Sequence, residues 1–315
     1  MEKFTSVNDI PNLKRAVDIA LDIKKNRYSY KKSGNNKTMV LLFFNPSLRT
    51  RLSTQKAAMN MGMNTMIMNV NEDNWKLESE KGVVMDGDKP EHLLEAIPVI
   101  GEYCDILGVR AFAHLKNREA DYSEEILNQF IEYAGVPVIS MEGSTRHPLQ
   151  SYADLLTIEE NKRQERPKVV LTWAPHPNPL PQAVTNSFIE WMRKTNYELV
   201  VTHPEGYELS DEFVDGINVE YDQKKAFKGA DFIYAKNWSS YSSYGKVLSR
   251  DPGWMVNEEK MALTNNARFM HCLPVRRNVV VTDGVLDSAA SIVVEQAANR
   301  EITAQAVIKM ILDDL

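Results

Sequence analysis

Cationic and hydroxyl side chains gather in residues 47–51, whose sequence is Ser-Leu-Arg-Thr-Arg. The segment follows an apolar run, residues 38–44, typical of a buried strand, and precedes an apolar-periodic run, residues 52–61, typical of a helix. Helix N-termini attract anions through free N–H groups and a partial positive charge, and guanidinium groups add paired donors. We predict a phosphate site that leaves one arginine to reach a reacting centre. The competing interpretation is a Ser47 helix cap beside solvated arginines.

A second group, residues 147–150, has the sequence His-Pro-Leu-Gln and opens another predicted helix. The helix dipole should disfavour the protonated form of His147, which could then donate one N–H to a carbonyl oxygen. Gln150 offers a donor and an acceptor to an amide. The alternative is a helix cap with a buried glutamine.

Residues 271–274, His-Cys-Leu-Pro, form a third group at the end of a predicted strand. Cys272 is either a reactive thiol or a small buried hydrophobe. The carbonyls of Cys272 and Leu273, next to a proline, could also accept hydrogen bonds from an amide. Arg276 and Arg277 follow and add anion-binding capacity.

Two isolated arginines complete the candidates. Arg110 directly follows a short predicted strand, residues 106–109, at the carboxyl end where open α/β sheets bind ligands. Arg300 follows a predicted helix, residues 291–299. For both, the alternative is a surface charge.

The elements that must position these groups alternate along the whole chain. Continuously apolar strand runs favour parallel sheets buried on both faces, and thus an α/β fold of two domains, each a parallel sheet flanked by helices. The expected strands are residues 39–44, 65–70, 106–109, 136–141, 169–173, 199–202, 232–235 and 269–271. The expected helices include residues 13–24, 51–61, 91–103, 123–134, 149–161, 182–194 and 302–315. We place one domain at residues 1–150, with a helix at 298–315 packing back on it, and the other at residues 151–297.

Composition narrows the classes of function. The chain has 315 residues, 43% of them hydrophobic, and a net charge of -6, which argues against a nucleic-acid surface. Its two cysteines are too few for a disulfide framework. We expect no signal peptide, no membrane span and a cytoplasmic setting. Dinucleotide, P-loop and zinc-protease motifs are absent. The acidic residues in 86–88 indicate a turn more than a cation site.

These motifs resemble a known family. Residues 47–51 match the S-x-R-T-R loop of the aspartate and ornithine carbamoyltransferases, residues 147–150 match their H-P-x-Q motif, and residues 271–274 match the H-C-L-P motif of the ornithine branch. All three occur in the family's order and at comparable spacing.

The resemblance implies roles in binding carbamoyl phosphate. Ser47, Leu48 through its backbone, Arg49 and Thr50 would hold the phosphate. Arg110 and His147 would hold the carbonyl oxygen, and the catalytic set would be Arg49, Thr50, Arg110 and His147. The amide would be held by Gln150, Cys272, Leu273 and Arg300, with Pro148 and Leu149 completing the motif. Family members are trimers that share active sites, so Trp75, in the 71–89 loop, would reach a neighbouring subunit; the alternative is a local core anchor.

The resemblance also bears on the second substrate. Ornithine enzymes carry a D-x-x-x-S-M-G loop whose aspartate pairs with the α-ammonium, whereas residues 236–245 lack it and begin with Lys236. Lys236 would repel an ammonium and attract a carboxylate, which favours an N-acylated ornithine. Residues 173–182 also look like the acylornithine branch. We expect His176, Glu142 and Arg276 to be further contacts.

Pro90 points to the acyl group. In the resemblance, the acetyl branch has glutamate at this position and the succinyl-specific branch has proline. A glutamate would repel a succinyl carboxylate. Pro90 could equally be the first residue of the helix predicted from residue 91. We expect carbamoyl transfer to N-succinyl-L-ornithine, without metal or cofactor, in a homotrimer. The alternatives are an N-acetylornithine enzyme or a non-catalytic small-anion binding protein.

Overall fold

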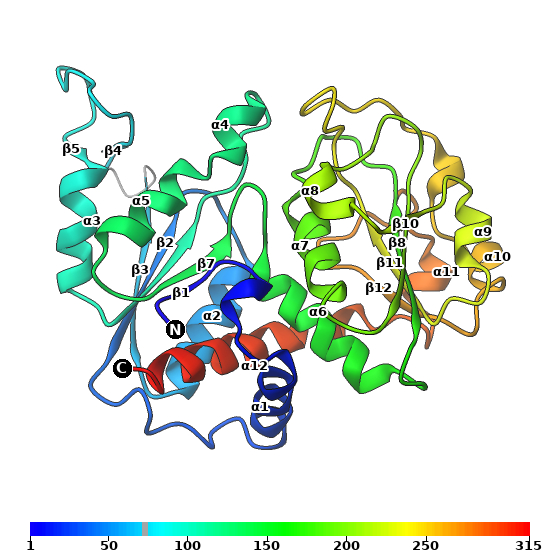
Figure 1. Cartoon of the computed structure of the whole chain (residues 1–315), viewed down its shortest axis with the longest axis horizontal. Coiled ribbons are helices and arrows are strands. Elements are labelled where there is room, and N and C mark those ends of the chain that lie inside the picture. The colour runs from blue at the N-terminus through cyan, green and yellow to red at the C-terminus, as the bar shows by residue number, and fades with distance from the viewer. Residues whose placement is uncertain (71–74) are drawn as a thin grey trace. The chain divides into compact units, whose positions relative to one another are not determined.

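The computed structural model describes residues 1–70 and 75–315 and alternates helices with parallel strands, so the predicted α/β class is confirmed (Figure 1). Contacts divide the chain into two compact units. The first unit comprises residues 1–113, 119–149 and 300–315, and the second comprises residues 114–118 and 150–299.

The first unit contains a parallel five-stranded sheet. Its order is β1 (Lys3–Phe4), β7 (Val138–Glu142), β6 (Ile106–Arg110), β2 (Thr38–Phe43) and β3 (Asn64–Asn69). The chain passes from β2 outward to β3 and then returns to β6 on the other side of β2. The strand order therefore reverses between β2 and β6, where open α/β sheets form ligand crevices at their carboxyl ends. The predicted phosphate segment follows β2, and Arg110 ends β6.

Helices cover both faces of this sheet. They are α1 (Leu13–Lys25), α2 (Arg49–Asn60), α3 (Leu93–Glu102), α4 (Arg118–Tyr122), α5 (Glu125–Tyr133) and the last turns of α12 (Val293–Leu312). Alternate strand residues such as Leu42 and Val109 pack with Ile97 of α3 and Phe130 of α5. Figure 1 shows α3 and α5 on one face and α2 on the other.

The second unit repeats this architecture. Its parallel five-stranded sheet has the order β10 (Asn218–Val219), β9 (Glu198–Thr202), β8 (Lys168–Trp173), β11 (Phe232–Lys236) and β12 (Arg268–Met270). Here the order reverses between β8 and β11, because the chain leaves β8 toward β9 and returns to β11 on its other side. The helices are α6 (Pro148–Asn161), α7 (Ala183–Met192), α8 (Asp211–Val214), α9 (Gln223–Phe227), α10 (Glu258–Met261), α11 (Asp283–Leu286) and the start of α12.

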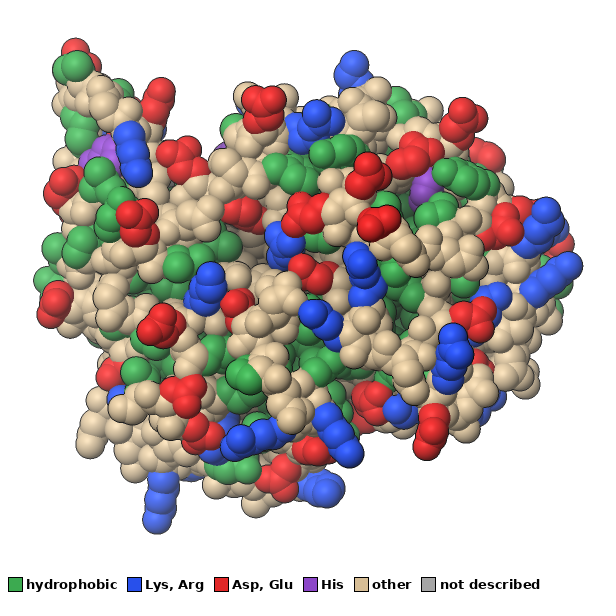
Figure 2. Space-filling view, in the orientation of Figure 1, with side chains coloured by type: hydrophobic (Ala, Val, Ile, Leu, Met, Phe, Trp, Pro, Cys, Tyr) green, Lys and Arg blue, Asp and Glu red, His purple; other side chains and the backbone are tan. Residues whose placement is uncertain are grey.

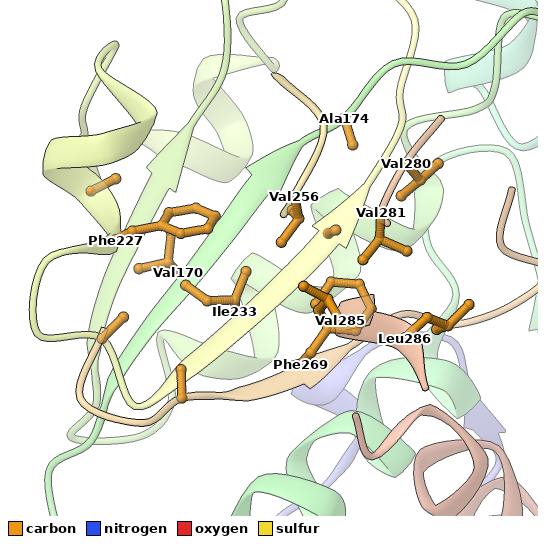
Figure 3. Packing of buried hydrophobic residues seen from close by; sticks show 14 of the residues in the cluster. Val170, Ala174, Phe227, Ile233, Val256, Phe269, Val280, Val281, Val285 and Leu286 are labelled. Atoms are coloured by element: carbon orange, nitrogen blue, oxygen red, sulfur yellow. The ribbon is translucent and has the colours of Figure 1, made fainter. Parts of the chain in front are cut away.

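A core of aliphatic and aromatic side chains fixes the second sheet (Figure 3). Val170, Ile233 and Phe269 project from neighbouring strands against Phe227 of α9 and Val285 of α11. Burial of such side chains contributes about 1.5–3 kcal/mol each. This packing holds the strand ends that carry Lys236 and residues 271–274.

Most predicted elements are confirmed within two or three residues, and three differences matter. α2 begins at Arg49 instead of residue 51. α3 begins at Leu93, capped by His92, so the prediction that Pro90 opens this helix is wrong. The helices predicted at 291–299 and 302–315 are one helix, α12, and Arg300 lies inside it rather than after a helix end.

Two surface features complete the description. Acidic and basic side chains are interspersed over the face drawn in Figure 2. The N-terminal amine pairs with Asp314, so the two ends of the chain meet within the first unit. In the part of the chain that the structure describes, no helix has the length and apolarity needed to cross a membrane.

Candidate active site

The turn after β2 places its functional groups in the first turn of α2. The Thr50 backbone N–H donates to Ser47 Oγ at 3.3 Å, but the N-cap residue of α2 is Leu48, so the interpretation of Ser47 as the N-cap is wrong by one residue. Because the helix begins at Arg49, Arg49 and Thr50 both belong to its positive end. Thr50 is buried, whereas Leu48 is 67% exposed, which leaves its backbone as the useful part. The hydroxyl of Ser47 therefore contacts the first turn of α2 from just before the N-cap.

The guanidinium of Arg110 is buried and held by hydrogen bonds, so the alternative interpretation of Arg110 as a surface charge is wrong. Its Nη1 donates to the carbonyls of Asn45 at 2.8 Å and Pro46 at 2.7 Å. Its Nε and Nη2 donate to Glu142 Oε2 at 3.1 and 2.8 Å. Arg110 thus joins the end of β6 to the turn that leads into α2, and this arrangement fixes the guanidinium plane.

Glu142, at the end of β7, is the counter-ion of this region. Burial raises the pKa of Glu142, but the charges of His147, Arg110 and Arg300 lower it more, so its pKa lies below the ordinary value. Its Oε2 lies 3.8 Å from His147 Nε2. The carboxylate is therefore ionised at neutral pH, one negative group among several cationic ones.

Arg300 lies against Thr50 and His147 in the same region of the first unit. Its Nη2 donates to Thr50 Oγ1 at 2.7 Å and lies 3.3 Å from His147 Nε2. Arg300 is 5% exposed, so a surface charge is again the wrong interpretation. The next residue, Glu301, accepts from Asn60 Nδ2 at 2.8 Å and thereby ties α12 to α2.

In the second unit, buried side chains connect Gln150 to the motif at residues 271–274. Gln150 Nε2 donates to Asp154 Oδ1 at 2.7 Å, and Gln296 Nε2 donates to the same oxygen at 2.6 Å. The backbone N–H of His271 donates to Gln296 Oε1 at 2.9 Å. Gln150 is therefore linked to residues 271–273 through Asp154 and Gln296. Pro148 opens α6 and Leu149 is buried.

Cys272 is buried, which favours its interpretation as a small hydrophobe. It stands beside Leu273, whose backbone N–H donates to His271 Nδ1 at 2.9 Å. The backbone conformation of residues 271–273 is thus fixed by the two bonds at His271.

Three second-substrate candidates also lie together in the second unit. Arg276 Nε donates to His176 Nε2 at 3.0 Å. Burial lowers the pKa of His176, and the charges of Arg276 and Lys236 lower it further, whereas a bond to the Asn178 carbonyl raises it. Neutral His176 can accept from Arg276 through Nε2. A cavity of about 480 Å³ lies here, lined by His176, Arg250 and Arg276 among others.

The loop before α3 forms a small parallel ribbon of β4 (Leu77–Glu78) and β5 (Glu91–His92). Pro90 is exposed on it. Trp75 is 48% exposed and donates through Nε1 to Glu91 Oε2 at 2.7 Å, so it is not a core anchor. Residues 71–74 of the loop expected at 71–89 lie outside the described residues. Asp88 pairs with Lys76, which agrees with a turn at 86–88.

Sequence reasoning missed several groups that orient the site. Asn45 and Pro46 act through backbone carbonyls, which leave no side-chain signal. Asp154 could have been found, because it lies four residues after Gln150 on one helix face. Gln296 and Glu301 act across long sequence separations, which no local pattern reveals. Among the described residues, no group of three or more His, Cys, Asp or Glu side chains is placed to hold a metal.

Known proteins share this sequence and architecture. The family model of the aspartate/ornithine carbamoyltransferase carbamoyl-P binding domain matches residues 2–160, and that of the Asp/Orn binding domain matches residues 181–311. The chain is 63% identical over 317 residues to the N-succinylornithine carbamoyltransferases of Bacteroides fragilis and Bacteroides thetaiotaomicron, covering 100% of both chains in each case. It is 37% identical to the N-acetylornithine carbamoyltransferase of Xanthomonas campestris, covering 88% of this chain and 87% of the relative.

A solved structure shares the fold. It is a Glu-to-Pro variant of N-acetyl-L-ornithine transcarbamylase complexed with carbamyl phosphate and N-succinyl-L-norvaline, with a TM-score of 0.92 and 34% identity, and the match covers 99% of this chain and 100% of that one. With two family models matched in order and full-length relatives at 63% identity, this chain belongs to the aspartate/ornithine carbamoyltransferase family.

Proposed function

We propose that this chain transfers the carbamoyl group of carbamoyl phosphate to the δ-amine of N-succinyl-L-ornithine, giving N-succinyl-L-citrulline and phosphate in arginine biosynthesis. The observation that carries the proposal is the 63% identity over the whole length of two N-succinylornithine carbamoyltransferases. The geometry of each unit supplies groups suited to this chemistry.

The phosphate of the donor is assigned to the N-terminus of α2. Ser47, the Leu48 backbone, Arg49 and Thr50 combine helix N–H groups, hydroxyls and a guanidinium, which together favour a dianion. As phosphate departs, its charge grows, and fixed positive groups stabilise it without reorganisation.

The carbonyl oxygen is assigned to Arg110, His147 and Thr50. Arg110 and His147 approach the same Glu142 oxygen, and Thr50 is reached through Arg300. Donors held in this way can stabilise the oxyanion of a tetrahedral intermediate. Arg300 carries only donors, so we assign it to oxygen atoms of the donor beside Thr50 rather than to the amide that the resemblance implied. Gln150 and the Cys272 and Leu273 carbonyls accept from the amide.

The reaction balances without a covalent enzyme intermediate. The neutral δ-amine attacks the carbonyl carbon, the tetrahedral intermediate collapses, and the carbon–oxygen bond to phosphate breaks. An alkyl ammonium has a pKa of about 10.4, so one proton must leave the amine first. The departing phosphate can accept a proton. Orientation of the two substrates can supply about 7–11 kcal/mol of the barrier reduction.

The acyl group is assigned from charge. Lys236 and Arg276 are cations for the carboxylates of the acceptor, and uncharged Pro90 leaves room for the succinyl carboxylate. The solved complex of N-succinyl-L-norvaline with a Glu-to-Pro variant of an acetylornithine enzyme supports this assignment of Pro90. Glu142, expected as a substrate contact, is better placed to orient Arg110.

A homotrimer in the cytoplasm is part of the proposal. Leu52 and Met59 on α2 and Met66 on edge strand β3 are each more than half exposed, and Trp75 is half exposed on the neighbouring ribbon. Exposed apolar side chains on an edge strand and a helix that contacts it are typical of association surfaces. Trp75 would then reach the phosphate site of a neighbouring copy.

The test is a panel of acceptors. The purified chain receives carbamoyl phosphate with N-succinyl-, N-acetyl- or unmodified L-ornithine, and citrulline products and phosphate are measured. We expect turnover with the succinyl compound above the others. Preference for the acetyl compound would favour the second candidate, an N-acetylornithine carbamoyltransferase, which the 37% identical relative supports. Absence of acceptor-dependent phosphate release would refute both.

A further inference from the structure

We propose that Asp154 is a positioning residue that sets which end of the Gln150 amide meets the carbamoyl donor. Through Gln296, the same carboxylate couples Gln150 to residues 271–273. The inference rests on the proposed function, in which Gln150 and two backbone carbonyls bind the donor's amide.

The orienting groups form one buried chain of hydrogen bonds within the second unit. Gln150, Asp154 and Gln296 are each 1% exposed or less. Two side-chain amides donate to a single oxygen, Asp154 Oδ1, at 2.7 and 2.6 Å. Burial raises the pKa of Tyr234, and nearby Asp154 and Cys272 raise it further. Buried polar groups of this kind must be satisfied, so their directions are strongly constrained.

The orientation of each amide follows from a neighbouring group that can only donate, or only accept, a hydrogen bond. The His271 backbone N–H can only donate, so the atom of Gln296 that faces it is the oxygen. The Gln296 nitrogen then faces Asp154 Oδ1, which must accept. The same oxygen accepts from Gln150, so the Gln150 nitrogen faces Asp154 and its carbonyl is the end left for a ligand.

This arrangement makes the amide site an acceptor of hydrogen bonds. The Gln150 oxygen and the carbonyls of Cys272 and Leu273 all require N–H donors. A carbamoyl group supplies an NH₂, whereas an acyl phosphate that carries a methyl group leaves these acceptors unpaired. Sites built to hydrogen-bond an N–H reject analogues that lack it much more strongly than apolar pockets do. Asp154 would therefore maintain selectivity for a carbamoyl donor without touching it.

Two stable phosphonates test the idea. Phosphonoacetamide carries the amide, and 2-oxopropylphosphonate replaces its NH₂ with a methyl group. Calorimetry gives, for each variant, the Kd of 2-oxopropylphosphonate divided by the Kd of phosphonoacetamide. We expect a high ratio for the wild type and a ratio lower by about tenfold for Asp154→Ala, because the freed Gln150 amide can present either end. Asp154→Asn retains an acceptor oxygen and should keep most of the selectivity.

Thr157→Val is the matched control. Thr157 lies on the same helix, is 0% exposed, and accepts from Asn299 of α12 at 2.9 Å. Its loss breaks a buried bond between the same two helices without involving Gln150, so stability should fall while the ratio stays. An equal loss of the ratio in Thr157→Val would overturn the inference, because the effect would be general loosening.

A second variant tests the inference if Asp154→Ala does not fold. Gln296→Met removes one donor to Asp154 and the acceptor of the His271 N–H, and it should also lower the ratio. If both Asp154→Ala and Gln296→Met keep the wild-type ratio, the inference about Asp154 is overturned and the proposed function still stands. A wild-type ratio near one overturns the assignment of carbamoyl phosphate to this site, and the inference with it.

Discussion

Glu142→Gln separates two possible roles of this carboxylate. As a substrate contact, Glu142 would affect mainly the KM for the acylornithine. As the partner of Arg110, it would affect kcat, the binding of carbamoyl phosphate and the stability of the first unit. The structure favours the second role, because Glu142 Oε2 accepts from two nitrogens of Arg110 at 3.1 and 2.8 Å.

The size of the effect follows from burial. The two side chains are 9% and 14% exposed, so the pair is close to fully buried. Removing one partner of such a pair costs roughly 3–5 kcal/mol, and retention of one acceptor in glutamine puts the expected loss near the lower end, about 3 kcal/mol. A misdirected oxyanion donor costs roughly 10²–10³ in kcat. We expect a loss of that order, with the KM for the acylornithine near its wild-type value.

The dependence on pH gives an independent check. The pKa of Glu142 is lowered in the folded state from an ordinary value of 4.5. Its contribution to stability is therefore complete above about pH 4.5 and is lost as the pH falls through the folded-state pKa. Urea unfolding should give a higher free energy of unfolding for the wild type than for Glu142→Gln at pH 7. This difference should become smaller below about pH 4.5.

Glu259→Gln is the control for the same chemical change. Glu259 pairs with Lys224 at 2.7 Å, but the two side chains are 72% and 55% exposed. Solvent screens such pairs, so stability at pH 7 and kinetics should both stay at wild-type values. A Glu142→Gln enzyme with unchanged kcat and stability, or with only a raised acylornithine KM, would refute the role assigned to the pair.

Three further predictions follow from the proposed sites. Arg49→Ala should lower kcat at least about 10²-fold while circular dichroism stays unchanged, because the phosphate loses its guanidinium; near-normal turnover would contradict the phosphate role. Trp75→Ala should impair turnover, and mixed with Arg49→Ala subunits it should regain part of the activity if Trp75 reaches a neighbouring copy; mixtures as inactive as their components would argue against sharing. Pro90→Glu should shift preference from N-succinyl- to N-acetyl-L-ornithine by roughly tenfold, read from the ratio of kcat/KM values, and an unchanged ratio would refute the charge argument.

The fold was accessible from the sequence because parallel strands buried on both faces leave a strong signal. Runs such as residues 39–44 and 232–235 are continuously apolar, and they form β2 and β11, inner strands that are paired on both sides. The shorter strands, such as β1 and β10, have two residues each and carry no periodicity. The break predicted before Arg300 failed because this buried arginine is satisfied by Thr50, which allows α12 to continue.

The site was accessible only in part, for a related reason. Arg110 and Arg300 could be proposed as ligand groups, but sequence could not distinguish them from surface charges. Burial and the partners of each guanidinium decide that question, and those partners come from Asn45, Pro46 and Thr50. Every residue has a backbone carbonyl, so the sequence does not show which carbonyls accept a hydrogen bond from an arginine.

The order of the strands gives a reason to assign the chemistry to these particular motifs. In the first unit the order reverses between β2 and β6, and the groups at the carboxyl ends of these strands are residues 44–50 and Arg110. In the second unit it reverses between β8 and β11, and the groups at their carboxyl ends are residues 174–182 and Lys236. Connections diverge to opposite sides at such a reversal, so the carboxyl ends of the two strands are left uncovered and can receive a ligand. The proposed donor-binding motif and the proposed acceptor-binding motif each occupy such a position, so the same topological rule, applied once in each unit, accounts for both placements.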